Sequence, residues 1–336
     1  MSKDNEKFIS GLSNHSILYM DTEKLKPISI LANAHDARIN DIQLVDGICF
    51  TGSNDGCVTV WDTRKSEASH KFKAPPGKQV YSVASVQYVL AGGSNKQIYF
   101  WDLKTTKKLN TFTGSHGDDV MKLTFHPEKN NVLLSGGEDG CVCSFDLRQN
   151  SEDDALESVV NVEQPVISCD FLAEDSNFAH ITTGVSTLKI VSLADAKELI
   201  DHNTIDNIDT NSKYLIHAYS VKNDPRLYYL CGNSNTGVIE EISIDWNLKG
   251  LKAAERVRQF VPQHLGVVTC ARKLREDIVL TASEDGSFKL SQQQFKANAD
   301  MFDLEEESKN MFMDEEIPES KPKSKRDFMN TFNPFQ

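Results

Sequence analysis

No run of apolar residues in this 336-residue sequence approaches the roughly 18–20 that a membrane-spanning helix needs. The first ten residues, MSKDNEKFIS, lack the apolar segment and the small-residue cleavage site of a secretory signal. We therefore expect a protein that stays inside the cell and does not associate with membranes. Seven cysteines are present, an odd number, and no Cys-x-x-Cys pair occurs. This usage argues against a disulfide framework and against a zinc ribbon.

Basic residues are also scarce. The chain has 36 Lys and Arg against 49 Asp and Glu, a formal net charge of −13. This balance opposes a protein that wraps duplex nucleic acid, because phosphate groups attract basic surfaces. It suits a basic protein partner, or solubility alone. We predict no direct binding of nucleic acid.

An internal repeat stands out in the sequence. Residues 51–62 (TGSNDGCVTVWD), 91–102 (AGGSNKQIYFWD) and 135–146 (SGGEDGCVCSFD) align without a gap. Four further copies are less regular and lie at residues 10–21, 183–192, 231–242 and 281–292. The seven copies end near residues 21, 62, 102, 146, 192, 242 and 292, so successive ends are 40 to 50 residues apart. This is the period of a propeller blade.

Each copy contains two short β-rich runs around an Asn/Asp/Gly turn, the pattern of a β-hairpin. Segments before and after the hairpin supply a third and a fourth strand, and no helical period competes with this pattern. The sequence thus predicts an all-β fold, a seven-bladed β-propeller over residues 7–299. Residues 300–336 form a separate segment, acidic and then basic, which we expect to be mostly disordered.

The Trp-Asp dipeptides Trp61-Asp62 and Trp101-Asp102 follow a Gly-Ser or Gly-Gly pair and a turn. This pattern resembles the WD40 repeat, and the resemblance implies a seven-bladed WD40 β-propeller. Residues 115–120 (SHGDDV), 125–127 (FHP) and 152–156 (EDDAL) resemble, more narrowly, the WD repeat-containing protein 89 group. That group has no assigned enzymatic activity. We expect no cofactor, no metal and no small-molecule substrate.

A His, a Ser or Thr and an Asp recur together and look at first like a hydrolase triad. The three sets are His35, Thr51 and Asp55; His116, Ser135 and Asp139; and His264, Thr281 and Asp285. Each set occupies the same place in its repeat, and this repetition argues against catalysis. The WD40 resemblance implies that the sets are buried hydrogen-bond relays, which end on a Trp of the third strand. Only the second blade has the whole pattern, with Trp61, because Phe145 and Ser291 replace the Trp in the fourth and seventh blades.

Propellers of this kind bind partners at the rim where the loops before the first strands and the hairpin turns emerge. The repeat register assigns these residues to that face: Asp36, Arg38, Lys78, Tyr81, Asp118, Asp119, Met121, Glu138, Glu163, His217, Tyr219 and Glu284. Six carboxylates oppose Arg38 and Lys78, so the face is predicted to be acidic and to attract a basic segment. A merely solvated rim is the alternative.

Two Trp/Phe-Asp-x-Arg boxes are a second candidate surface. They end at Arg64 and Arg148. The boxes resemble the short motif by which some WD40 proteins dock on the adaptor of cullin-4 ubiquitin ligases, and the two arginines would be the contact residues. The alternative is an arginine that closes its own blade against a carboxylate.

The C-terminal segment changes sign along its length. Residues 303–316 (DLEEESKNMFMDEE) are acidic, and a basic cluster follows at Lys321, Lys323, Lys325 and Arg326. This cluster is a nuclear-localisation candidate, with a solubilising tail as the alternative. We expect a nuclear protein, with a cytoplasmic population left open.

These observations favour a non-enzymatic scaffold for protein–protein interaction whose acidic face binds a basic partner. Two sharper alternatives remain open. One is a substrate receptor of a cullin-4 type ubiquitin ligase. The other is a dedicated chaperone of a basic ribosomal protein or a histone.

Overall fold

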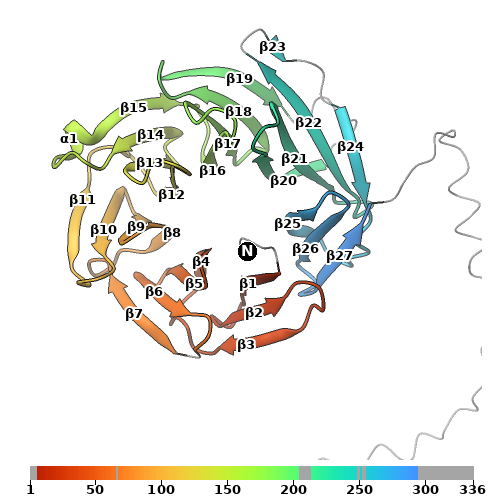
Figure 1. Cartoon of the computed structure of the whole chain (residues 1–336), viewed down its shortest axis with the longest axis horizontal. Helices are drawn as coiled ribbons and strands as arrows, with labels where there is room; N and C mark the ends of the chain where they lie inside the picture. The colour runs from red at the N-terminus through yellow and green to blue at the C-terminus, as the bar shows by residue number, and fades with distance from the viewer. Residues whose placement is uncertain (1–5, 66, 204–212, 248–249, 252–254, 294–336) are drawn as a thin grey trace, which may run out of the picture. The chain divides into compact units, whose positions relative to one another are not determined.

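The computed structural model describes residues 6–65, 67–203, 213–247, 250–251 and 255–293. The chain divides into two units, Met1–Gln294 and Phe295–Gln336, and all the described residues lie in the first. In that unit, seven antiparallel sheets surround a central axis (Figure 1). The prediction of an all-β, seven-bladed propeller is confirmed.

Each sheet is one blade, and its strands run in chain order from the axis to the rim (Figure 1). The first four blades consist of β1 (Lys7–Gly11), β2 (Ile17–Asp21) and β3 (Pro27–Leu31); β4 (Ile39–Val45), β5 (Ile48–Ser53), β6 (Cys57–Asp62) and β7 (Ala68–Lys73); β8 (Val80–Val86), β9 (Val89–Ser94), β10 (Gln97–Asp102) and β11 (Lys108–Phe112); and β12 (Val120–Phe125), β13 (Val132–Gly137), β14 (Cys141–Asp146) and β15 (Leu156–Asn161). A one-turn helix, α1 (Glu152–Ala155), precedes β15.

The last three blades complete the ring. They consist of β16 (Val166–Phe171), β17 (Phe178–Thr183), β18 (Thr187–Ser192) and β19 (Lys197–Asn203); β20 (Lys213–Ser220), β21 (Arg226–Asn233), β22 (Ile239–Asn247), β23 (Gly250–Leu251) and β24 (Glu255–Phe260); and β25 (Val268–Arg275), β26 (Ile278–Ser283) and β27 (Phe288–Gln292). In the sixth blade, both β23 and β24 pair with β22. β22 continues five residues past the predicted repeat end at residue 242. No helix among the described residues is long and apolar enough to cross a membrane.

The position of a strand in its blade decides which of its side chains are buried. All six residues of β6 are buried, because this strand lies in the middle of its sheet with a blade on either side. Its neighbour β7 lies on the rim, and Phe72 is its one buried residue. The tight turn before β6 needs a positive φ, and Gly56 supplies it at +76°. The Asp55 carboxylate accepts the Cys57 backbone N–H across this turn (2.9 Å).

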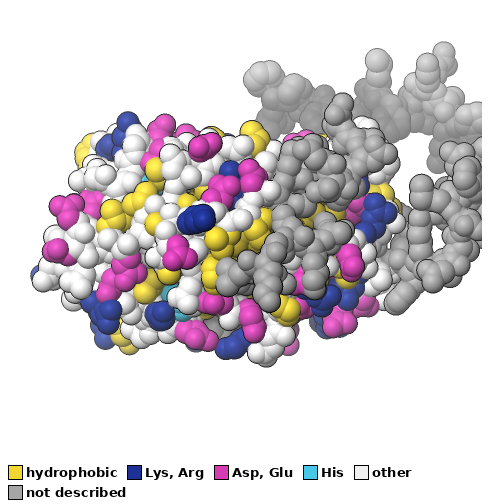
Figure 2. Space-filling model, turned by 90° about the horizontal axis from the view of Figure 1, so that it is seen from above, with side chains coloured by type: hydrophobic (Ala, Val, Ile, Leu, Met, Phe, Trp, Pro, Cys, Tyr) yellow, Lys and Arg dark blue, Asp and Glu magenta, His cyan; other side chains and the backbone are white. Residues whose placement is uncertain are grey.

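The hydrophobic core consists of separate clusters, one between each pair of neighbouring blades. Phe50, Val58 and Phe72 of the second blade, for example, pack against Leu90 and Trp101 of the third. Among the described residues there are seven such clusters, one for every interface of the ring. All seven cysteines are free thiols. On the outer wall of the ring, acidic and basic side chains are interspersed (Figure 2).

The ring closes between its first and seventh blades, which have three strands each. Phe8 on β1 packs against Phe288 on β27, with ring centroids 5.2 Å apart, and Met20 and Leu280 join them. Side-chain packing therefore bridges this seam in the described part of the chain. The two segments that could supply a closing strand by sequence, residues 2–6 and 294–299, lie outside the described residues except for Glu6.

Glycines on the second strands allow neighbouring blades to approach closely. A Cβ atom added to Gly136 on β13 would lie 2.4 Å from Val166 Cγ1 and 3.2 Å from Cys169 Sγ of the next blade. Gly52 faces Val83 and Val80 of the third blade in the same way, at 2.8 and 2.9 Å. A larger side chain at these positions would push the blades apart.

We predict that Gly136→Ala lowers the free energy of unfolding by about 1–3 kcal/mol, because the added methyl group overpacks a filled interface. Urea denaturation measures the effect. Gly184→Ala is the matched control, since its Cβ would meet nothing nearer than 3.8 Å and its stability should change little. Val166→Ala should restore part of the loss in the Gly136 variant. Equal stabilities of the two glycine variants would contradict this account of the interface.

Candidate partner-binding face

The loops that join the outermost strand of one blade to the innermost strand of the next emerge at one end of the ring. The hairpin turns between the second and third strands emerge at the same end, because neighbouring strands are antiparallel. We call this end the upper face. Ten of the twelve predicted partner-binding residues lie on it: Asp36, Arg38, Lys78, Tyr81, Asp118, Asp119, Met121, Glu138, Glu163 and Glu284.

The other two predicted residues, His217 and Tyr219, lie elsewhere, and their assignment to this face is wrong. β20 begins at Lys213, so His217 is the fifth residue of the strand and not its first. Tyr219 pairs with Tyr228 next to the opposite turn. Both residues face a cleft near the other end of the ring, the lower face.

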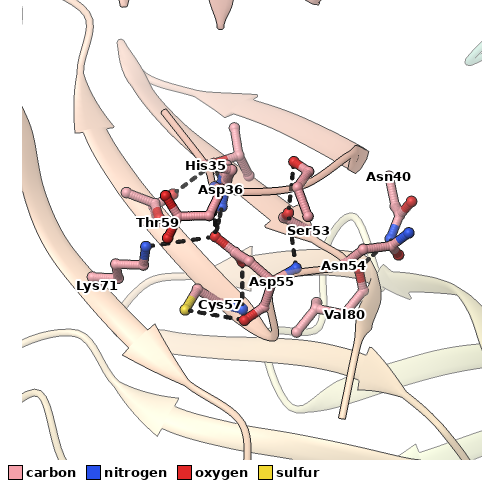
Figure 3. Close-up of polar contacts among 12 residues, drawn as sticks. His35, Asp36, Asn40, Ser53, Asn54, Asp55, Cys57, Thr59, Lys71 and Val80 are labelled. Carbon is pink, nitrogen blue, oxygen red and sulfur yellow. Dashed lines mark hydrogen bonds and ion pairs between the residues drawn. The ribbon is translucent and has the colours of Figure 1, made fainter. Parts of the chain in front are cut away.

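Under the upper face, the second blade forms the hydrogen-bond relay that the resemblance implies (Figure 3). His35 Nδ1–H donates to Asp55 Oδ2 (3.0 Å), and its Nε2 lies 2.7 Å from Thr51 Oγ1. Trp61 Nε1–H donates to the same Thr51 oxygen (3.1 Å). The relay thus ties the loop before β4 to the middle of the sheet.

The fourth and seventh blades repeat the first two steps of the relay. His116 contacts Asp139 (3.2 Å) and Ser135 (2.7 Å). His264 contacts Asp285 (3.1 Å) and Thr281 (2.8 Å). Phe145 and Ser291 have no indole N–H, so these relays end on the hydroxyl group.

Burial sets the charge state of the relays. It lowers the pKa of His35 and outweighs the nearby Asp55 carboxylate, so the imidazole is neutral near pH 7. Burial also works against the ionised form of Asp139. The hydrogen bonds from His116 and the Cys141 N–H prevail, however, and the pKa of Asp139 falls to about 2. In the second blade, a neutral His35 next to the ionised Asp55 leaves the relay with one negative charge.

The relays cannot act as catalytic triads, because no hydroxyl group in them is reachable. Thr51, Ser135 and Thr281 are each 0% exposed. A nucleophile must reach its substrate, and these oxygens are enclosed between two blades. We assign the relays a structural role.

Neighbouring loops of the upper face are also tied to each other. The Asn40 side-chain amide donates to Asn54 Oδ1 (2.6 Å) and to the Val80 carbonyl of the next blade (2.8 Å) (Figure 3). Asn40 lies next to a cavity of about 420 Å³ that brings together Arg38, Tyr81 and Met121 from three different blades. These three residues were predicted as partner-binding.

Sequence reasoning missed five residues that line this cavity: Asn40, Asp41, Lys122, Ile167 and Ser168. Asn40 is the second residue of β4 and lies two positions after Arg38, so the two-residue period of a strand could have identified it. Lys122 lies 3.8 Å from Asp41 of the second blade. That contact joins residues 81 positions apart, and nothing in the sequence indicates it. Ile167 is 51% exposed and adds an apolar contact next to the acidic residues.

Three carboxylates of the upper face form a cluster, which we call the acidic cluster. Oxygens of Asp118, Asp119 and Glu138 all lie within 4.8 Å of one another. Asn95 donates to Asp119 Oδ1 (2.9 Å) and to the Tyr81 hydroxyl (2.8 Å), which holds this side of the cluster in place. In the part of the chain that the structure describes, none of the three forms an ion pair. Their spacing would also admit a cation, but two of the three are exposed, and exposed acidic groups of this kind are common without an ion. We assign no metal.

The two Asp-x-Arg boxes adopt one geometry. Arg64 Nε and Nη2 donate to the two oxygens of Asp62, each at 2.9 Å. Arg148 Nε and Nη2 donate to the two oxygens of Asp146 in the same way (3.0 and 2.6 Å). Both arginine side chains remain largely exposed, 83% and 72%. Each arginine therefore pairs with the aspartate of its own box and still presents one side to solvent.

The nuclear-localisation candidate, Lys321, Lys323, Lys325 and Arg326, lies outside the described residues.

Comparison with known proteins identifies the repeat. A family model described as "WD domain, G-beta repeat" matches residues 25–62 and 106–146. The first match covers β3 to β6 and the second covers β11 to β14, so each includes one of the three relays. The chain therefore contains WD40 repeats, as the sequence resemblance implies. Its propeller resembles a chain in a crystal structure of the mitotic checkpoint complex, with a TM-score of 0.68, 16% identity and coverage of 87% of this chain and 85% of that one. At this identity the likeness concerns the fold alone.

Among curated WD40 relatives, the WD repeat-containing protein GTS1 of Arabidopsis thaliana is 33% identical over 171 residues, 47% of this chain and 44% of that protein. The WD repeat-containing protein 89 homolog of Dictyostelium discoideum is 30% identical over 156 residues, 46% and 43% of the two chains. Histone acetyltransferase type B subunit 2 of Candida glabrata is 27% identical over 157 residues, 43% and 37%. The chain thus spans less than half the length of these relatives. WD40 propellers of this kind are usually protein-interaction scaffolds.

We predict that Thr51→Val lowers the free energy of unfolding of the WD40 propeller by about 2–4 kcal/mol. The change keeps the shape of the side chain but leaves both His35 Nε2 and Trp61 Nε1 without a partner, at about 1–3 kcal/mol for each buried group. Ser135→Ala is the matched control, because only His116 loses a partner there, and it should cost roughly half as much. Urea denaturation compares the two. A larger loss in Ser135→Ala would contradict the role of the indole N–H.

We also predict that the propeller loses stability as the pH falls from about 7.5 to about 5.5. Burial lowers the pKa of His35, His126 and His180 below the usual histidine value of about 6.5. The unfolded chain therefore takes up protons at a higher pH than the folded chain, and stability is lost once the pH falls below about 6.5. The low pKa of Asp139 acts separately, below about pH 4. A urea midpoint that stays constant from pH 7.5 to 5.5 would refute this prediction. In the His180→Gln variant, the urea midpoint should change less over the same pH range.

Proposed function

We propose that this WD40 propeller is a non-enzymatic scaffold that binds a basic segment of a protein partner on its upper face, and that it does so in the nucleus. The observation that carries the proposal is the acidic cluster. Three carboxylates within 4.8 Å of one another have no ion pair among the described residues.

Electrostatics supports a basic partner. Two like charges about 4 Å apart repel by about 4 kcal/mol at an effective dielectric constant of 20, and a cation placed between them relieves that repulsion. Asp36, Glu163 and Glu284 lie on the same face, also without an ion pair in the described chain. Arg38, Lys78 and Lys96 offset only part of this charge, so the face attracts Lys and Arg side chains.

Two observations support a role without catalysis. The only recurrent His, Ser/Thr and Asp sets of the described chain are buried and hydrogen-bonded inside the blades. The WD40 relatives with which the chain aligns are generally scaffolds.

The class of partner follows from charge. One aligned relative is, by its name, a subunit of a histone acetyltransferase, and histones are basic proteins. A dedicated chaperone of a histone or of a basic ribosomal protein is a narrower form of the same proposal. The basic cluster at residues 321–326 supports nuclear localisation.

A substrate receptor of a cullin-4 type ligase is the second candidate. The exposed sides of Arg64 and Arg148 favour it, because both boxes present the same geometry. Each guanidinium group already donates two hydrogen bonds to an aspartate, however. Only its remaining N–H groups could donate to an adaptor. We therefore place the basic-partner proposal first.

We predict that the triple variant Asp118→Asn, Asp119→Asn, Glu138→Gln weakens binding of a lysine-rich histone-tail peptide by about tenfold or more, because three partly exposed ion pairs contribute up to about 1 kcal/mol each. Fluorescence anisotropy measures the affinity. Binding by the natural chain should weaken steeply as salt rises, and binding by the triple variant should depend less on salt.

The matched control is Glu67→Gln, Asp153→Asn, Glu255→Gln, which removes the same charge from exposed residues outside the upper face. Its affinity should stay close to that of the natural chain. If the two triple variants lose equal affinity, the effect depends on the net charge of the chain alone, and the assignment of the site is overturned. A basic ribosomal protein used as a second probe tests the narrower chaperone form.

A further inference from the structure

The lower face carries a second site of opposite character. A cleft of about 560 Å³ opens between the sixth and seventh blades, where β20, β21 and β25 lie side by side (Figure 1). We call it the lower cleft. Five of its lining residues are cationic: Arg226, Arg258, Arg272, Lys273 and Arg275. This concentration is unexpected in a chain with a net charge of −13.

Three aromatic rings form a ladder along one wall of the lower cleft. The rings of Tyr228 and Tyr219 stack with centroids 5.5 Å apart and an interplanar angle of 13°. Tyr219 stacks in turn on His217, at 6.1 Å and 21°. A guanidinium group stands at either end, since Arg226 lies 5.2 Å from the centroid of Tyr228 and Arg272 donates a hydrogen bond to His217 Nε2. The ladder limits the rotamers of both arginines before any ligand arrives.

A buried carboxylate next to the cleft holds two of its cations and one rung of the ladder. Glu241 is 0% exposed and accepts hydrogen bonds from Arg258 Nη1 (2.8 Å), Lys273 Nζ (2.7 Å) and the Tyr219 hydroxyl. Its burial favours the neutral form, but the hydrogen bonds from Lys273, Tyr219 and Arg258 prevail and lower its pKa. Two cations thus share one ionised carboxylate, and the cleft retains positive charge.

Arg272 differs from the other cations of the cleft. Arg226 pairs with Asp224 (2.8 Å) and Arg275 with Glu23 (2.8 Å). Arg258 also lies 3.9 Å from Glu276. Arg272 has no carboxylate partner within the described ranges, and its side chain is exposed. Its hydrogen bond goes to a neutral imidazole, because burial and the charge of Arg272 keep the pKa of His217 well below its usual range. The remaining guanidinium donors are available to an anion.

We propose that the lower cleft binds an acidic segment of a partner polypeptide, with Arg272 as its principal anion contact. An anionic oxygen accepts from the free Arg272 donors in the bidentate geometry that guanidinium groups favour. Val221, which is 44% exposed, and Leu274 line the same cleft and offer contact to a neighbouring apolar side chain. The volume holds several side chains and exceeds what a single small oxyanion fills. This site is independent of the upper face and has the opposite charge preference.

The test uses the full chain and three synthetic peptides of one length. The first alternates glutamate and leucine, the second has glutamine for every glutamate, and the third has phosphoserine. Fluorescence anisotropy should show binding of the glutamate peptide that weakens as salt rises, and no binding of the glutamine peptide. Arg272→Gln should raise the dissociation constant of the glutamate peptide by about tenfold or more, the loss expected for one charge-assisted hydrogen-bond pair.

Arg64→Gln is the matched control, because it removes an equally exposed arginine that lies outside the lower cleft. Its affinity should equal that of the natural chain, and so should that of the upper-face triple variant. Tighter binding of the phosphoserine peptide, lost in Arg272→Gln, supports the site and identifies phosphate as the preferred anion. Equal binding by Arg272→Gln and the natural chain overturns the proposal. Binding of the glutamine peptide, or no binding of either anionic peptide up to about 1 mM, overturns it as well.

Discussion

Face-to-face packing between neighbouring sheets is the interaction on which the rest of this propeller depends. The middle strands are enclosed between two blades, and all six residues of β6 are buried. The close approach of Gly136 to Val166 sets how near two blades can lie. The relays also lie within this packing between neighbouring blades. The polar groups of the second-blade relay are tolerated at this depth because they pair with one another, as His35, Thr51 and Trp61 do.

Because the blades are rigid, the loops between them can carry charge without loss of structure. The upper face gathers carboxylates that repel one another, and the Asn40 amide and the relays hold the loops that bear them. The lower cleft gathers cations around a buried glutamate. The acidic cluster and the lower cleft therefore have opposite charge, although the net charge of the chain is −13. Under the two proposals above, the scaffold would hold two partners of different character.

The fold was predictable from sequence because a propeller repeats one local pattern, and the Asp-Gly turns and Trp-Asp dipeptides mark its period. The upper face followed from the same register in the blades whose repeats are regular. Register failed in the sixth blade, where β20 has eight residues and begins at Lys213, so His217 and Tyr219 were assigned to the wrong end. The lower cleft could not be predicted. Its contacts join Tyr219, Glu241 and Lys273, which come from three strands of two blades and share no motif.

The seam between the first and seventh blades has a consequence for chain connectivity. Every other pair of neighbouring blades is linked by a loop of the backbone, whereas here Phe8 and Phe288 meet through side chains. The cluster at the seam is nevertheless of the same kind as the other six. Among the described residues, side-chain packing joins these two blades. Such a molecule is suited to circular permutation, because a new backbone link at the seam and a cut in any exposed loop would leave all seven interfaces in place.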